Sequence, residues 1–236
     1  MRRTLIIIFA LISINYSQNI PFKVGEKLTY TLHFNIIKMG RGYLSVESID
    51  KISGLQSYHV KFQAKTSKFA DNIYRVRDEI DIWLNTSDLT TLKLLKQLNE
   101  GKYHKNYDTS IDYNNLIAIT NNDTLEINGP LRDPYSLLYY FRTIPLNVGE
   151  ILDFTTFDQN KLTEFQVIVD SKETIDVPAG QIPCIIVKPY RGGKTLLKNE
   201  GDMTIWLSDD NRRLPVQIQI KIKYGSMLLQ LIDINL

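Results

Sequence analysis

The chain has 236 residues, 43% of them hydrophobic, with 28 basic and 26 acidic residues and a net charge of +2. Residues 1–17 contain two arginines and no acid, so removing them leaves 26 residues of each sign and a neutral chain. Scattered, balanced charge argues against nucleic acid as a partner, and the single cysteine, Cys184, excludes an internal disulfide framework.

The first seventeen residues predict a cleaved export signal. Arg2 and Arg3 precede an apolar run from residue 5 to residue 14, and Ser17 offers a small residue at the expected cleavage site. The run is too short to span a bilayer, although an uncleaved anchor is an alternative interpretation. No later stretch is long and apolar enough for a membrane helix, so we expect no transmembrane segment in the mature chain.

Alternating apolar and polar residues predict β-strands along most of the remaining chain. Leu28, Tyr30 and Leu32 alternate with polar residues, and Ile218, Ile220 and later positions repeat the pattern. Turn signals rich in Gly, Asn and Asp separate these short runs. The pattern predicts an all-β protein with antiparallel sheet built mostly from consecutive hairpins.

Two stretches of the chain repeat at nearly constant spacing. Val24-Gly25-Glu26 recurs as Val148-Gly149-Glu150, where 148 − 24 gives an offset of 124. Ile82-Trp83-Leu84 recurs as Ile205-Trp206-Leu207, where 206 − 83 gives an offset of 123. We interpret this as an internal duplication of one β module, although similar strands can also reuse similar residues.

One segment between the two repeats predicts a helix. Asp133 is placed to cap it, Pro134 occupies its first position, and Pro145 ends it. We therefore expect a first β module over residues 18–130, a helical bridge over 131–144 and a second β module over 145–236. Additional strands between residues 102 and 127 make the first module the longer one.

An ordered set of short motifs resembles the bacterial domain-of-unknown-function family 3108. These motifs are Val24-Gly25-Glu26, Val76-Arg77-Asp78, Glu100-Gly101-Lys102-Tyr103, the helix from Asp133 to Arg142, Val177-Pro178-Ala179-Gly180, Ile205-Trp206-Leu207-Ser208-Asp209 and Arg213-Leu214-Pro215-Val216. The resemblance covers nearly all of the mature chain. It implies an exported protein of Gram-negative bacteria with curved, half-barrel-like sheets, and it implies no catalytic residues. We expect a periplasmic protein, or one peripheral to the outer membrane.

No pattern in the sequence predicts catalysis, a cofactor or a metal site. The three histidines fall on separate strands without companion ligands, and nucleophile and phosphate-binding motifs are missing. Asp78 falls on the apolar side of its strand and needs a partner there, for which Arg142 is our candidate. The two residues form either a structural staple between bridge and sheet or part of a ligand site.

The remaining candidate ligand-binding residues come from two other segments. Tyr139 belongs to the aromatic cluster of the bridge, which either lines a curved sheet or packs against it. Lys188, Arg191 and Lys194 belong to a basic, glycine-containing hairpin that is either solvated or in contact with anionic groups of the cell envelope.

Three functions follow as hypotheses. The favoured one is a non-catalytic envelope module that binds a lipid, a glycan or a partner protein, or acts as a scaffold. The second is a hydrolase of envelope polymers that uses carboxylates such as Asp78 and Asp133. The third is an integral outer-membrane β-barrel, against which the central helix counts.

Overall fold

The computed structural model describes residues 20–191, 194–195, 202–223 and 225–236. The predicted export signal and part of the basic hairpin therefore lie outside the described residues. Two helices accompany the strands, α1 (Lys68–Asp71) and α2 (Pro134–Phe141). The strands are β1 (Lys27–Phe34), β2 (Ile37–Ile52), β3 (Leu55–Thr66), β4 (Arg77–Asn85), β5 (Thr91–Glu100), β6 (Tyr103–Asp112), β7 (Ile117–Thr120), β8 (Asp123–Glu126), β9 (Ile151–Asp158), β10 (Lys161–Val177), β11 (Gly180–Arg191), β12 (Lys194–Thr195), β13 (Asp202–Ser208), β14 (Pro215–Ile222) and β15 (Gly225–Asn235).

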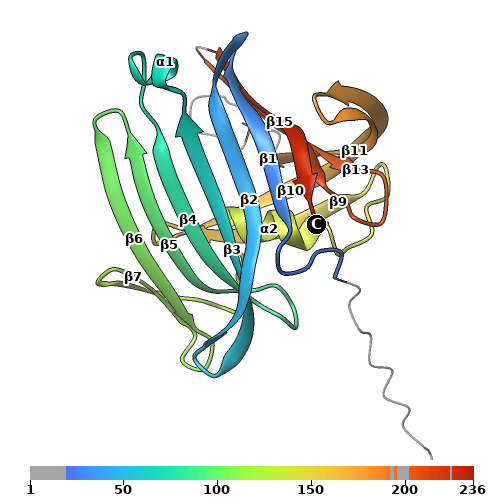
Figure 1. The fold of residues 1–236 in the computed structure, drawn as a ribbon. Helices are drawn as coiled ribbons and strands as arrows, with labels where there is room; N and C mark the ends of the chain where they lie inside the picture. Colours follow the sequence, from blue (N-terminus) through green and yellow to red (C-terminus); the bar gives the residue numbers. More distant parts are fainter. Residues whose placement is uncertain (1–19, 192–193, 196–201, 224) are drawn as a thin grey trace, which may run out of the picture.

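The strands form one antiparallel sheet that curls around α2 (Figure 1). Its order is β8-β7-β6-β5-β4-β3-β2-β1-β15-β14-β13-β11-β10-β9, and β12 pairs only with β11. The prediction of an all-β antiparallel fold is confirmed. The two modules do not form two separate sheets, however, because β1 pairs with β15 along its whole length. The expected pair of half-barrel-like modules is thus replaced by one continuous open sheet.

The two Val-Gly-Glu sequences adopt the same local structure. Gly25 and Gly149 have φ angles of 95° and 89°, which glycine reaches without the steric cost of a side chain. The amide of Gly25 donates to the carbonyl of Val46, and the amide of Gly149 donates to that of Val169. Each turn therefore ties the start of one strand to the next strand in the chain, its partner in the first hairpin of each run.

The match extends across both runs of strands. A register irregularity follows Val46 in β2 and Val169 in β10. The indole of Trp83 donates to Asp50 at 2.8 Å, and the indole of Trp206 donates to Glu173 at 2.5 Å. Six strands follow in the same order in each run, with β1 to β6 corresponding to β9, β10, β11, β13, β14 and β15.

The helix α2 begins where the sequence predicts. Asp133 is its N-cap, and the carboxylate accepts hydrogen bonds from the amides of Tyr135 and Ser136. Thr91 on β5 donates its hydroxyl to the same carboxylate at 2.7 Å. The cap therefore fixes both the start of the helix and its attachment to the sheet, and α2 lies inside the curve of the strands (Figure 1).

The edge strand β9 approaches β5, an inner strand of the other half of the sheet, along a seam. Leu131 accepts a hydrogen bond from the amide of Thr91, and Arg132 accepts one from the amide of Phe157. The ammonium of Lys96 on β5 forms an ion pair with Asp158 on β9. Strand pairing is replaced here by a short strap of backbone and one ion pair, so β8 and β9 remain the edges of the sheet.

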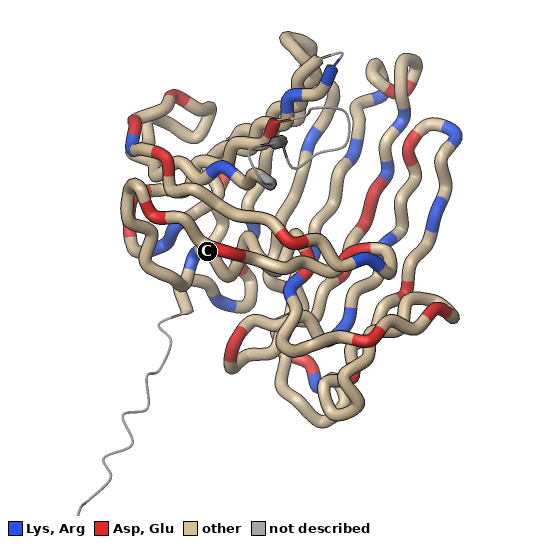
Figure 2. Tube along the Cα trace, turned by 180° about the vertical axis from the view of Figure 1, so that it is seen from behind, with Lys and Arg blue, Asp and Glu red and all other residues tan. Residues whose placement is uncertain are grey.

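Buried apolar residues face the concave side of the sheet, and charged residues recur along the strands (Figure 2). Leu28, Ile82 and Leu207 are fully buried inside, and Cys184 is buried among them as predicted. On the outside, Lys61 forms ion pairs with Glu79 and Asp81. The alternation in sequence therefore corresponds to the two faces of the sheet.

Candidate functional site

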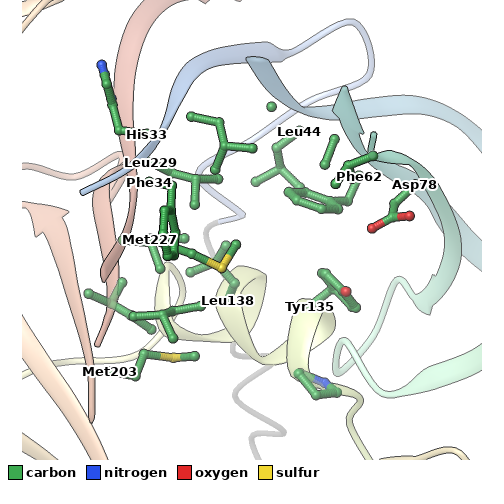
Figure 3. Close-up of a pocket in the computed structure, with 18 of the residues that line it drawn as sticks. His33, Phe34, Leu44, Phe62, Asp78, Tyr135, Leu138, Met203, Met227 and Leu229 are labelled. Atoms are coloured by element: carbon green, nitrogen blue, oxygen red, sulfur yellow. The ribbon is translucent and has the colours of Figure 1, made fainter. Parts of the chain in front are cut away.

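A large apolar cavity lies between α2 and the concave face of the sheet (Figure 3). Its volume is about 750 Å³, within the range of small-molecule binding sites. Strands from both runs line it. The apolar lining is Leu32, Phe34, Met39, Gly42, Leu44, Phe62, Ala64, Ile73, Val76, Pro134, Leu137, Leu138, Phe141, Phe165, Val167, Pro189, Met203, Ile205, Ile218, Ile220, Met227 and Leu229.

The floor of the cavity is the inward face of α2. Leu137, Leu138 and Phe141 all line it, and Tyr135 lies beside them. Ser136 faces away from the cavity and receives the hydroxyl hydrogen bond of Thr91 at 3.0 Å. Because the cap and this hydroxyl pair anchor the helix, the floor is held at a fixed depth below the strands.

Small residues keep the walls of the cavity apart. Gly42 on β2 faces inward, and a Cβ at this position would lie 3.3 Å from Cδ2 of Leu229. Ala64 on β3 also lines the cavity, between the larger Phe62 and Thr66. Longer side chains at these two positions would occupy space that is now part of the cavity.

The cavity reaches the surface at the tips of the strands. Three of its lining residues are substantially exposed: Ile73 at 62%, Tyr74 at 48% and Met227 at 36%. They belong to the segment after α1 and to the start of β15. The opposite end is closed by α2, so a ligand would enter beside α1 and the β14–β15 hairpin.

Two carboxyl groups face the cavity near this mouth. Asp78 accepts a hydrogen bond from the amide of Asn99 at 2.8 Å and is oriented toward the cavity (Figure 3). Glu100 lies beside it at the end of β5. Burial, together with the hydrogen bond and negative charge of Asp78, raises the pKa of Glu100 above its usual value. The pair is the main polar feature of an otherwise apolar lining.

Replacing Glu100 with glutamine is expected to raise the thermal midpoint of unfolding at neutral pH. Because the pKa of Glu100 is higher in the folded state than in the unfolded state, the protonated side chain is compatible with the fold and the ionised side chain destabilises it. Glutamine cannot ionise, so it avoids this destabilisation at pH values above the folded pKa. The advantage of Glu100→Gln should therefore shrink as pH falls to about 4, near the unfolded pKa of glutamate. Thermal unfolding followed by circular dichroism across this range measures it.

Glu79→Gln on the outer face is the matched control. Lys61 and Gln63 hold the pKa of Glu79 below its usual value, so this carboxylate stabilises the fold above its unfolded pKa. Its replacement should lower the midpoint at neutral pH, opposite in sign to Glu100→Gln. Shifts of the same sign for the two variants would contradict the assignment of Glu100.

The structure separates the candidate residues taken from the sequence. Asp78 lines the cavity, whereas Tyr139 is completely buried beneath it and packs against Phe22. Lys188 lies outside the cavity and pairs with Asp170 at 2.9 Å. The side chains of Arg191 and Lys194 lie outside the described part of the structure.

The predicted pairing of Asp78 with Arg142 is wrong. Arg142 instead forms two hydrogen bonds with the carboxylate of Glu26, at 2.6 and 2.9 Å, and both side chains are buried. Its remaining donors bond to the carbonyls of Pro21 and Arg212. The guanidinium thus joins α2 to the turn before β1, and its role is structural.

The proposed hydrolytic use of Asp133 is also corrected. Its carboxylate is buried and occupied by the helix cap and by Thr91, so it does not face the cavity with Asp78. Within the described ranges, no group of three or more His, Cys, Asp and Glu residues is arranged to hold a metal ion. His33 borders the cavity but points away from it (Figure 3).

Sequence reasoning missed Glu100 because its neighbour Gly101 marks a turn, where acidic residues are common. In the structure, Val76 pairs with Glu100 as an isolated bridge, which brings the turn against the cavity mouth. The alternation of β5 alone gave no sign of this. The sequence contains both Val76-Arg77-Asp78 and Glu100-Gly101, but it does not indicate that these two motifs contact each other in the fold.

Comparison with known proteins establishes the family. Residues 29–232 match the family described as "Protein of unknown function (DUF3108)", and the chain belongs to this family. No curated protein matches the chain in sequence. The resemblance recognised from the ordered motifs is therefore confirmed.

One solved structure shows the same fold at low sequence identity. A crystal structure of a β-barrel-like protein of domain-of-unknown-function family 1849 from Brucella abortus is 12% identical, with a TM-score of 0.62. The match covers 90% of this chain and 98% of that one. The hypothetical protein CT021 from Chlamydia trachomatis is 8% identical over 90% of this chain and 87% of its own, with a TM-score of 0.41.

A search of the described residues for membrane-spanning helices finds no helix with the necessary length and apolar character.

Proposed function

We propose that the protein is an exported, non-catalytic binding module that holds one apolar chain, of the kind found in lipids, in the cavity above α2. The observation that supports this most directly is the size and composition of the cavity. The helix α2 is held against the sheet by Asp133 with Thr91 and by Arg142 with Glu26. Between helix and sheet there remains a large space, whereas protein interiors normally pack side chains to high density.

The free energy of an empty cavity supports occupancy. Apolar walls that face open space lack the contacts that neighbouring side chains supply in a packed core, so an apolar group that covers them is stabilising. Ordered water is a poor substitute, because each water needs two to four polar partners and the lining is almost entirely apolar. An apolar chain provides the contacts that the walls lack.

The lining favours a lipid over the other proposed ligands. A glycan presents many hydroxyl groups, each of which needs a hydrogen-bond partner when buried. The polar groups that face the cavity interior are few, and the two carboxyl groups stand only at its mouth. A partner protein would need to insert a segment through that mouth. A single flexible hydrocarbon chain fits the cavity and buries no polar group that would need a hydrogen-bond partner.

Export is the second part of the proposal. It is supported by the apolar run and the arginines of residues 1–17. We place the mature protein in the periplasm, beginning near Gln18. Binding of cell-envelope lipid follows from the proposed location.

The repeated run of strands supports duplication as the origin of the fold. We infer that residues 18–130 and 145–236 derive from one ancestral unit, joined by the bridge at 131–144. The matching turns at Gly25 and Gly149 and the matching indole hydrogen bonds support this inference. A cavity shared by two similar units then has walls of similar curvature on either side.

Native mass spectrometry of the mature protein, exported and purified from a Gram-negative host without detergent, tests the binding function. We expect one adduct of lipid mass for each protein chain. After extraction of bound lipid, titration with cis-parinaric acid should give saturable fluorescence at a ratio of one to one. A bare chain that also gives no saturable signal would falsify the proposal.

A further inference from the structure

Three neighbouring segments form an apolar rim around the cavity mouth. They are the β1–β2 turn, the α1 segment through residue 75, and the β14–β15 hairpin. The amide of Asn35 donates to the carbonyl of Ser226, and the amide of Ser67 donates to that of Met39. These bonds place the three segments side by side at one end of the molecule (Figure 1).

The rim exposes a concentration of large apolar side chains. Seven of the fifteen exposed large apolar residues in the described part of the chain belong to it. Ile36 is 95% exposed and Phe69 is 68% exposed, although neither lines the cavity. The full set is Ile36, Ile37, Phe69, Ile73, Tyr74, Ile222 and Met227. A concentration of exposed apolar side chains of this kind on a protein surface marks an interaction site.

Basic residues are interleaved with these apolar side chains. Lys38 follows Ile36 and Ile37, Lys68 precedes Phe69, Arg75 follows Ile73 and Tyr74, and Lys221 precedes Ile222; all four basic side chains are exposed. Of the acidic residues nearby, Asp71 is paired with Arg77 at 2.6 Å, Asp78 and Glu100 face the cavity at its mouth, and Asp202 is exposed at the start of β13. The opposite end of the molecule carries Asp50, Asp88 and Asp112 together with the exposed Lys23 and Lys51.

We propose that this rim docks the cavity mouth onto the surface of an anionic phospholipid bilayer. Apolar side chains flanked by Lys and Arg are the combination that binds at a lipid interface, where the apolar groups enter the acyl boundary and the cations meet phosphate. Figure 2 shows basic residues, with acidic ones among them, at the upper ends of the strands. Charge complementarity therefore identifies the partner as a bilayer with net negative charge.

Docking in this orientation gives the cavity direct access to lipid. Ile73, Tyr74 and Met227 belong both to the rim and to the cavity lining, so the two surfaces are continuous. A chain that leaves the bilayer at this point passes from one apolar environment to another without crossing water. The docking surface itself depends on the exposed residues and not on the contents of the cavity.

Co-sedimentation of the full mature chain with vesicles tests the docking surface. We expect binding to vesicles of phosphatidylcholine and phosphatidylglycerol, at least tenfold weaker binding to phosphatidylcholine alone, and weaker binding as salt is raised. The double variants Ile36→Ser/Phe69→Ser and Lys68→Glu/Lys221→Glu should each lose at least tenfold in affinity for the anionic vesicles.

Matched variants at the opposite end distinguish docking from nonspecific adsorption. Ile49→Ser/Leu116→Ser removes two exposed apolar side chains, and Lys23→Glu/Lys51→Glu reverses two exposed charges. Both should bind anionic vesicles as the unmodified protein does. No vesicle binding by the unmodified protein, or equal losses in the control variants, would overturn the proposal. Because Ile36, Phe69, Lys68 and Lys221 do not line the cavity, the rim variants should still bind cis-parinaric acid, which separates this result from the proposed cargo function.

Discussion

Arg142→Met is expected to lower the free energy of unfolding by about 3–5 kcal/mol, the cost of leaving a buried charge without its partner. The guanidinium and the carboxylate of Glu26 are almost completely shielded from water and are joined by two hydrogen bonds. Removing the cation leaves Glu26 charged inside the protein, and two backbone carbonyls also lose a donor. Urea-induced unfolding followed by tryptophan fluorescence measures the change.

Arg212→Met provides the control for this experiment. Arg212 also bonds through two nitrogens to one carboxylate, that of Asp210, but its side chain is 49% exposed. An exposed ion pair contributes about 1 kcal/mol or less, so this variant should stay close to the unmodified protein. Equal destabilisation of the two variants would show that burial of the Glu26 pair does not carry the effect.

Replacing an alanine inside the cavity with an aromatic residue is expected to weaken cargo binding strongly. Ala64→Phe places a ring in the space between β3 and α2, where the proposed apolar chain lies. We expect the affinity for cis-parinaric acid to fall at least tenfold, with the thermal midpoint maintained because the ring fills an existing void. Fluorescence titration and thermal unfolding of the same preparation give the two quantities.

Lys65→Phe, at the next position of β3, separates this effect from a general change in the strand. Lys65 is exposed on the outer face, so its replacement adds the same ring outside the cavity. Binding of cis-parinaric acid should be unchanged. If Ala64→Phe binds as well as Lys65→Phe does, the cavity is not the binding site.

The sequence predicted features that depend on neighbouring residues. Asp133 and Pro134 define the start of α2 through local hydrogen bonding and backbone geometry, and the helix begins there. The alternation of apolar and polar residues likewise predicted the strands, because successive side chains of a strand point to opposite faces of the sheet. The near-constant offset also paired Trp83 with Trp206, whose indoles make equivalent hydrogen bonds.

Features that depend on distant contacts could not be predicted in this way. Glu26 precedes the first strand and looks like a turn residue, yet it is 116 positions from the arginine that it binds. The cavity depends on the curl of the whole sheet and on small side chains such as Gly42 at its inner surface. No local pattern specifies which inward-facing residues contact each other and which are separated by open space.

The seam between β5 and β9 affects how the cavity can adapt to its contents. In a sheet that closes on itself, the number of strands and their stagger determine the circumference. Here the backbone strap at Leu131 and Arg132 and the ion pair between Lys96 and Asp158 span the gap instead. The circumference at this joint therefore depends on two backbone hydrogen bonds and one ion pair, and no strand ladder has to break for it to change. We infer that so few contacts allow the width of the cavity to follow the thickness of what it encloses.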